Sequence, residues 1–179
     1  MLNEKLRRLL LEYARRAIEL FLREGVEYEP EQVPEELLQP RGAFVTIKVG
    51  GKLRGCIGYV EPIFPLYKSV IKAAISAATS DFRFPPLTLE ELPEAHIEIS
   101  VLSRPRPVRS IEEIKVGKHG IIISRGFYRG LLLPQVPLEY GWDLEEYLKH
   151  GCLKAGLEPD CWRRGDVTIE VFEAEVFGE

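Results

Sequence analysis

Two adjacent glycines, Gly50 and Gly51, separate two short runs of residues that favour β-strands. The first run spans residues 43–49 and the second spans residues 52–59. Two-residue hairpin turns need positive φ angles, which glycine adopts at little cost. The sequence therefore predicts an antiparallel hairpin with Gly50-Gly51 as its turn.

A two-residue turn also sets the register of such a hairpin. It pairs Val49 with Lys52, Ile47 with Arg54, and Val45 with Cys56. Because side chains alternate across a sheet, we expect Arg54 and Cys56 on the face that carries Val45 and Ile47. Both faces carry apolar residues, so we expect the hairpin to be covered on both sides.

The remaining chain mixes helical and strand patterns without a regular βαβ rhythm. Helical patterns span residues 3–24 and 66–79, and a third helix follows the capping pair Asp143 and Glu146. Strand patterns span residues 96–102, 121–124, 131–133 and 167–177. This mixture predicts an α+β fold with a mainly antiparallel sheet flanked by helices.

The composition restricts the class of protein. The chain has 179 residues and a net charge of -4, which argues against a nucleic-acid partner. It has no apolar signal core and no run of the roughly 20 apolar residues that a membrane helix needs, so we expect a soluble cytoplasmic protein. Dense Glu and Arg with few thermolabile residues indicate a thermophilic source.

The cysteines give no familiar pattern. Cys56, Cys152 and Cys161 cannot all pair within one chain, and none forms a C-x-x-C motif. We therefore expect neither a disulfide framework nor a metal site. Nucleotide-binding loops and hydrolase elbows are also absent from the sequence, so the cofactor is unknown.

Arg54 and Cys56 are the first candidates for a site. A guanidinium favours the thiolate form of a nearby cysteine, and a glycine inside a strand marks the close approach of a ligand or another backbone. Gly55 and Gly58 are such glycines. In the alternative interpretation, Cys56 is a small core residue and Arg54 forms a buried ion pair with an acidic residue. The carboxylates that could pair with Arg54 are Asp81, Glu98 and Glu170.

Three further candidates lie outside the hairpin. Asp81 and Arg83 occupy a loop that Pro85 and Pro86 stiffen, which can present fixed side chains to a ligand or simply anchor the loop through a salt bridge. His119 lies in a turn before a strand, where it is either a functional residue or an exposed one.

These residues lie in blocks that resemble one protein family. The blocks are LRGCIG (Leu53, Arg54, Gly55, Cys56, Ile57 and Gly58), GAFVT, DFRFPPL, IEISVL, GKHGIII, LLLPQV, WDLEEYL and KAGL, in this order. Together they resemble the AMMECR family, named for the chromosomal region of Alport syndrome, mental retardation, midface hypoplasia and elliptocytosis. The resemblance spans nearly the whole chain. It implies one α+β domain over residues 1–179, with a main lobe from both chain ends and a smaller lobe from the central residues.

The resemblance assigns no activity, so we consider two hypotheses, of which one makes the protein an enzyme and the other does not. The first is an enzyme or substrate-binding domain for a small anionic molecule, with the LRGCIG strand lining its pocket. Arg54, Asp81 and Arg83 would bind the substrate, Cys56 would be the nucleophile, and His119 would accept its proton.

The alternative is a non-catalytic protein-interaction module in which LRGCIG is a structural hairpin. Its glycines would let the helix over residues 66–79 pack closely against the strand. The resemblance implies Memo-like and radical-SAM proteins of the same pathway as partners.

Overall fold

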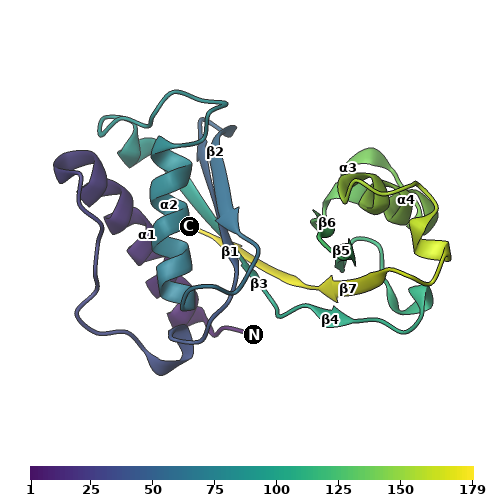
Figure 1. The fold of residues 1–179 in the computed structure, drawn as a ribbon. Helices are drawn as coiled ribbons and strands as arrows, with labels where there is room; N and C mark the ends of the chain where they lie inside the picture. The colour runs from purple at the N-terminus through teal and green to yellow at the C-terminus, as the bar shows by residue number, and fades with distance from the viewer. The chain divides into compact units, whose positions relative to one another are not determined.

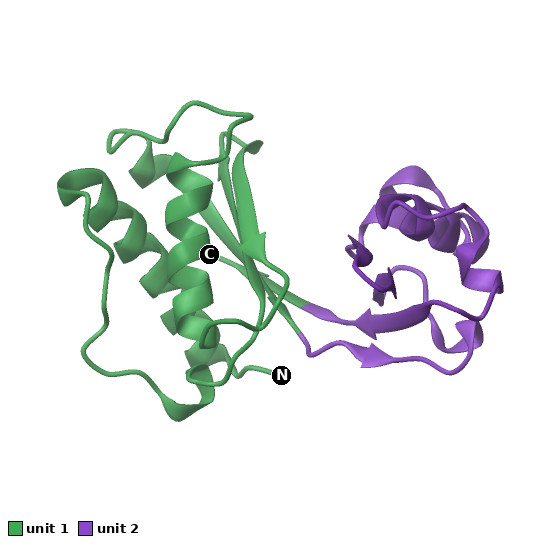
Figure 2. Cartoon of the chain, in the orientation of Figure 1, with its two compact units in different colours: residues 1–102, 175–179 green, residues 103–174 purple.

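The computed structural model describes residues 1–179, which form two compact units (Figure 2). Unit 1 contains residues 1–102 and 175–179, and unit 2 contains residues 103–174. Each unit has its own hydrophobic core and its own four-stranded sheet. The predicted α+β fold is confirmed.

Unit 1 is a sheet with two helices on one face (Figure 1). Its strands lie in the order β2-β1-β3-β8, and β1 pairs antiparallel with both β2 and β3. The elements are α1 (Glu4–Glu24), β1 (Ala43–Val49), β2 (Lys52–Tyr59), α2 (Leu66–Thr79), β3 (Ala95–Leu102) and β8 (Ala174–Gly178). Short 3-10 turns occupy Glu35–Leu37 and Leu92–Glu94.

Local signals set the limits of the first helix. The Asn3 side chain accepts a hydrogen bond from the Leu6 amide at 2.9 Å, and Gly25 ends the helix with a φ of 70°. One face of α1 is buried in the core of unit 1 and its outer face carries ion pairs four residues apart. None of the helices combines the length and the apolar character needed to cross a membrane.

The hairpin forms as predicted, but the predicted register is wrong from Arg54 onward. Val49 pairs with Lys52, and both turn glycines have positive φ angles of 60° and 75°. Arg54 is then an extra residue, because Lys48 pairs with Leu53 and Ile47 pairs with Gly55. This β-bulge moves every later residue of β2 by one position.

The bulge changes which face Cys56 occupies. Cys56 pairs with Thr46, whereas the buried Val45 and Ile47 pair with Ile57 and Gly55. Cys56 therefore lies on the outer face of the sheet, away from α2, and not beside Val45 and Ile47. The expected cover on both sides is also wrong, because the outer-face residues of β1 are only half-buried.

Gly55 faces helix α2 because only a residue without a side chain fits there. A Cβ atom at this position would lie 2.0 Å from the carbonyl oxygen of Ala77. Gly58 has a different reason, since its Cβ would lie 2.4 Å from the ring of Phe44 on the neighbouring strand. The protein itself thus occupies the space that both glycines leave.

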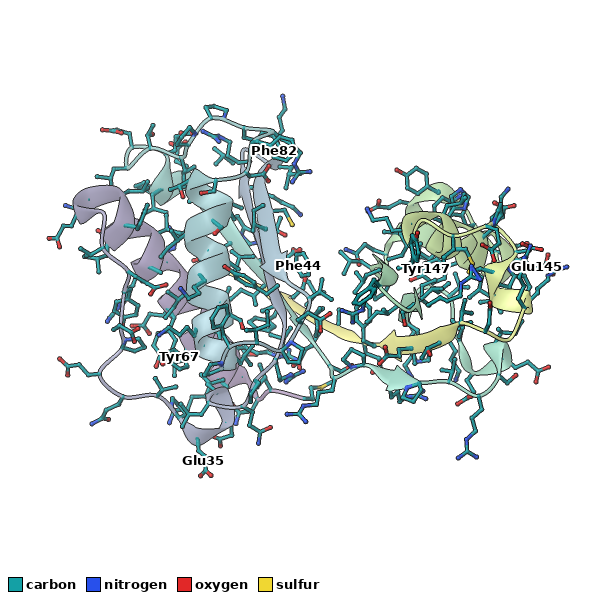
Figure 3. All side chains as sticks on the ribbon, viewed as in Figure 1. Glu35, Phe44, Tyr67, Phe82, Glu145 and Tyr147 are labelled. Carbon is teal, nitrogen blue, oxygen red and sulfur yellow. A yellow bond between two sulfur atoms is a disulfide. The ribbon has the colours of Figure 1, made fainter.

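Unit 2 packs a helix against a second sheet whose order is β4-β7-β5-β6, and each strand pairs antiparallel with its neighbours. The elements are β4 (Arg106–Pro107), β5 (Gly120–Arg125), β6 (Tyr128–Leu132), α3 (Val136–Tyr140), α4 (Leu144–Lys154) and β7 (Thr168–Phe172). 3-10 turns occupy Ile111–Glu113 and Cys161–Arg163. Tyr147 of α4, labelled in Figure 3, is fully buried, and its hydroxyl lies within hydrogen-bond distance of the carbonyls of His119, Leu132 and Leu133.

Two strand predictions in this part of the chain are wrong. β6 begins at Tyr128, directly after a Gly126-Phe127 turn, and not at Leu131. The single strand expected over 167–177 is two strands that belong to different sheets, β7 in the second and β8 in the first. The apolar residues alternate at positions 169 and 171 and then at 172, 174 and 176. This change of phase next to Glu173 is the sequence signal that a single strand does not explain.

One disulfide joins Cys152 of α4 to Cys161, and both residues are fully buried in unit 2. The cysteine spacing did not predict it, because their approach depends on the turn that follows α4. A bridge closing so short a loop stabilises a fold by about 2.5 kcal/mol in the chain-entropy account.

We expect Gly55→Ala to destabilise unit 1 by about 1–3 kcal/mol, because the added methyl group must displace the Ala77 backbone. Urea unfolding followed by circular dichroism measures the change. Ser100→Ala, on the half-buried outer face, is the matched control and should stay within about 0.5 kcal/mol. Equal midpoints for the two variants would show that α2 does not require a glycine.

Candidate functional site

The side chain of the bulged residue, Arg54, fastens a loop to the edge of the sheet. Its Nε and Nη2 donate to the two carboxylate oxygens of Glu91 at 3.2 and 3.1 Å. Its other contacts are the carbonyl oxygens of Pro85 and Pro86. The loop over residues 81–91 is therefore attached to strand β2 through one guanidinium.

Arg54 does form an ion pair, but with a residue that sequence reasoning missed. The expected partners were Asp81, Glu98 and Glu170, whereas Glu91 holds the guanidinium. The Thr88 amide and hydroxyl also donate to Glu91, and these bonds together with Arg54 hold the pKa of Glu91 below its ordinary value. Each nitrogen of the Arg54 guanidinium thus already has a protein acceptor.

A second ion pair attaches the start of the same loop to β2. Asp81 Oδ2 accepts the Cys56 amide hydrogen at 3.0 Å, and Arg83 Nη2 donates to the Cys56 carbonyl at 3.4 Å. Arg83 also binds both Asp81 oxygens, at 3.0 and 2.7 Å. Because β2 is an edge strand, these two side chains satisfy backbone groups that no neighbouring strand could reach.

The charges in this second pair stabilise each other. Hydrogen bonds from Arg83 are the main cause that lowers the pKa of the Asp81 carboxyl, and the Cys56 amide adds to the effect, while burial opposes it. The side chain of Asp81 is 3% exposed and that of Arg83 is 48% exposed. The structure therefore shows the loop-anchoring salt bridge that was the alternative for these two residues.

The thiol of Cys56 lies on the outer face of β2 and is half-buried. Its sulfur is 3.2 Å from the hydroxyl oxygen of Thr46 on the neighbouring strand. Cys56 is the one cysteine outside the disulfide. It is thus neither a sealed core residue nor a fully exposed one.

His119 belongs to unit 2, whereas the other four predicted site residues belong to unit 1. It is 4% exposed, so the alternative of an exposed turn residue is wrong. Its Nδ1 accepts the Lys115 amide hydrogen at 3.0 Å, and its Nε2 lies 3.5 Å from a Glu173 oxygen. Burial lowers the pKa of His119, and Glu173 partly opposes this shift. Its pairing with Cys56 stays a prediction.

The anchored loop exposes an aromatic side chain between its fastened ends. Phe82 is 97% exposed and projects from the end of unit 1 (Figure 3). It lies between Asp81 and Arg83, while Leu87 is buried and its amide donates to the Ala78 carbonyl. No group of three or more His, Cys, Asp or Glu side chains is arranged to hold a metal ion.

This geometry defines a class of α+β protein with two units, in which a proline-containing loop is fastened to a glycine-containing edge hairpin. The chain belongs to the AMMECR1 family, whose profile matches residues 11–177. The predicted family is confirmed.

Relatives in archaeal thermophiles cover most of the chain. Protein MJ0810 of Methanocaldococcus jannaschii is 52% identical over 93% of this chain and 87% of its own length. Protein NEQ441 of Nanoarchaeum equitans is 49% identical over 95% of this chain and 98% of its own. The crystal structure of the uncharacterized protein PH0010 from Pyrococcus horikoshii is 46% identical, covers 99% of this chain and 93% of that chain, and has a TM-score of 0.87.

Removing the Arg54 guanidinium should loosen the loop over residues 81–91. We expect Arg54→Met to lower the free energy of unfolding of unit 1 by about 1.5–3 kcal/mol, because Glu91 and two prolyl carbonyls lose a charged donor. Limited proteolysis should then cut within the loop. Arg8→Met is the matched control, because it removes an exposed ion pair with Glu4 whose contribution is close to zero. Wild-type protease resistance in Arg54→Met would contradict this account of the loop.

Unit 2 should lose stability as the pH falls from 7 to 5. The folded state lowers the pKa of His119, so the unfolded state binds its proton more readily below about pH 6.5. Tryptophan fluorescence measures this unfolding, because Trp142 and Trp162 both belong to unit 2. His119→Asn should flatten the dependence, whereas His96→Asn should leave it unchanged. A wild-type dependence in His119→Asn would assign the effect to other groups.

Proposed function

We propose that this protein is a protein-interaction module that binds its partner through the loop over residues 81–91. The observation that carries the proposal is the 97% exposure of Phe82 on a loop fastened by two ion pairs. An aromatic side chain on a fixed backbone loses little conformational entropy on binding, and buried aromatic anchors dominate many interfaces.

The loop and the adjoining strand expose further apolar residues. Pro85 and Pro86 are exposed on the same loop, and Leu53 of the adjoining strand is 40% exposed. Arg54 joins these two segments because it follows Leu53 in β2 and contacts both prolyl carbonyls. We call Leu53, Phe82, Pro85 and Pro86 the Phe82 surface. A complementary partner would carry an apolar pocket that receives the ring.

The first candidates for the partner are the Memo-like and radical-SAM proteins that the family resemblance implies. We propose the cytoplasm as the compartment of this encounter. The close fit of Gly55 against α2 supports the module, because it gives the LRGCIG strand a packing role that needs no ligand.

Phe82→Ala should weaken binding to such a partner by about 30-fold, the effect of removing one interface hot spot. Titration calorimetry with the purified Memo-like protein of the same organism measures the affinity. Phe127→Ala is the matched control, because Phe127 is an equally exposed phenylalanine at a turn of unit 2. If binding survives Phe82→Ala, or if both variants weaken it equally, the proposal that the partner binds through the Phe82 surface is rejected.

As a second function, we propose that the LRGCIG strand binds or converts a small anionic molecule at the thiol of Cys56. The half-buried thiol and its contact with Thr46 support this proposal. Arg83 is the more available cation, since its side chain is 48% exposed while the nitrogens of Arg54 already donate to the loop. Asp81 would orient Arg83.

Iodoacetamide should label Cys56 in the folded protein without prior reduction. The other two cysteines are joined in the disulfide, so mass spectrometry should find one label for each chain. Cys56→Ala should abolish the label and leave the melting temperature nearly unchanged. A thiol that reacts only after denaturation would exclude the second function and leave the first intact.

A further inference from the structure

Three aromatic rings of unit 2 form a stack that no function above uses. The Tyr140 and Trp142 rings lie 4.9 Å apart between centroids and are inclined by 16°. Trp142 in turn stacks on His150 of α4, at 3.8 Å and 11°. The order of the stack is therefore Tyr140, Trp142, His150, with Trp142 in the middle.

The inner members hold this stack in place. The Nδ1 atom of His150 lies 2.8 Å from the Glu146 carbonyl oxygen, within the same helix. Trp142 and His150 are half-buried, and the Trp142 amide donates to the Pro137 carbonyl. The outer ring thus rests on a rigid support.

Tyr140 at the outer end is 67% exposed. One face of its ring lies on Trp142, so the exposed area belongs mainly to the other face and the ring edge. Leu138 of the same short helix is 64% exposed and adds apolar surface. A planar group could stack on the exposed face of Tyr140 and continue the series.

The charges around the stack select which planar group this would be. Between residues 136 and 150 the chain carries four carboxylates and a single lysine. The carboxylates are Glu139, Asp143, Glu145 and Glu146, and the lysine is Lys149. Asp143 caps α4, Glu145 pairs with Arg163, and Glu146 lies within 3.9 Å of Lys149, so Glu139, the residue before Tyr140, is the carboxylate that could meet an added cation. A nucleobase brings phosphate, which this acidic segment repels. A guanidinium is planar, cationic and suited to aromatic faces.

Unit 2 already contains one contact of this kind. The guanidinium carbon of Arg163 lies 4.5 Å from the ring centroid of Trp162, and an Arg163 nitrogen lies 3.5 Å from a Glu145 oxygen. A guanidinium held between an aromatic face and a carboxylate is therefore compatible with the charges of this unit.

We propose that the exposed face of Tyr140 is a docking site for an arginine side chain of a partner protein. The ring face would bind the guanidinium, and the carboxylate of Glu139, the preceding residue, would attract its charge. This site is independent of the Phe82 surface, since its residues belong to unit 2 and those of the Phe82 surface belong to unit 1. Either proposal can fail while the other holds.

The test uses acetylated, amidated tetra-arginine as the probe and tetra-lysine of the same form for comparison. Binding is followed at low salt by NMR of the full chain, through the indole N–H signal of Trp142. We expect tetra-arginine to shift this signal and to bind more tightly than tetra-lysine. Tyr140→Ala should weaken tetra-arginine binding by about two- to fivefold, the range of an exposed cation–π contact.

Two further variants separate the ring from general charge. Tyr140→Phe keeps the aromatic face and should retain the affinity. Tyr128→Ala removes a tyrosine of the same unit that is 59% exposed, and should also leave it unchanged. Equal affinities for the two peptides, an unmoved Trp142 signal, or equal effects of Tyr140→Ala and Tyr128→Ala would each overturn the proposal.

Discussion

The attachment of one loop to one edge strand is the constraint on which the architecture of unit 1 depends. Strand β2 ends its sheet, so the amide and carbonyl of Cys56 point away from any neighbouring strand. Asp81 and Arg83 satisfy both groups, and Arg54 draws the other end of the loop to the same strand. The Asp81–Arg83 pair thereby supplies hydrogen bonds that a further strand would otherwise make, and the Arg54–Glu91 pair holds the far end of the loop.

This arrangement explains why so short a strand contains two glycines and a bulge. The bulge releases Arg54 from the alternation of the sheet, so that its side chain can reach Glu91. Gly55 then allows α2 to approach, and Gly58 leaves room for the ring of Phe44. The bulge and the two glycines each weaken the strand, and each makes possible a contact with another segment.

The same ion pairs connect structure to binding. A loop of this length would ordinarily be mobile, and an exposed aromatic residue on it would bind weakly because ordering the loop costs entropy. Fastening the loop at Asp81 and Glu91 removes most of that cost before any partner arrives. Unit 2 reaches a similar result by stacking, since Trp142 supports Tyr140.

The sequence alone determined the features that depend on neighbouring residues. The glycine turn, the helix over residues 66–79, the Asn3 cap and the family itself were all predictable, because each signal lies within a few residues or in ordered blocks. Only the tertiary structure decided the bulge at Arg54, its pairing with Glu91 and the disulfide of unit 2. These features join residues that local patterns treat as independent, and packing selects one pairing among several of similar chemistry.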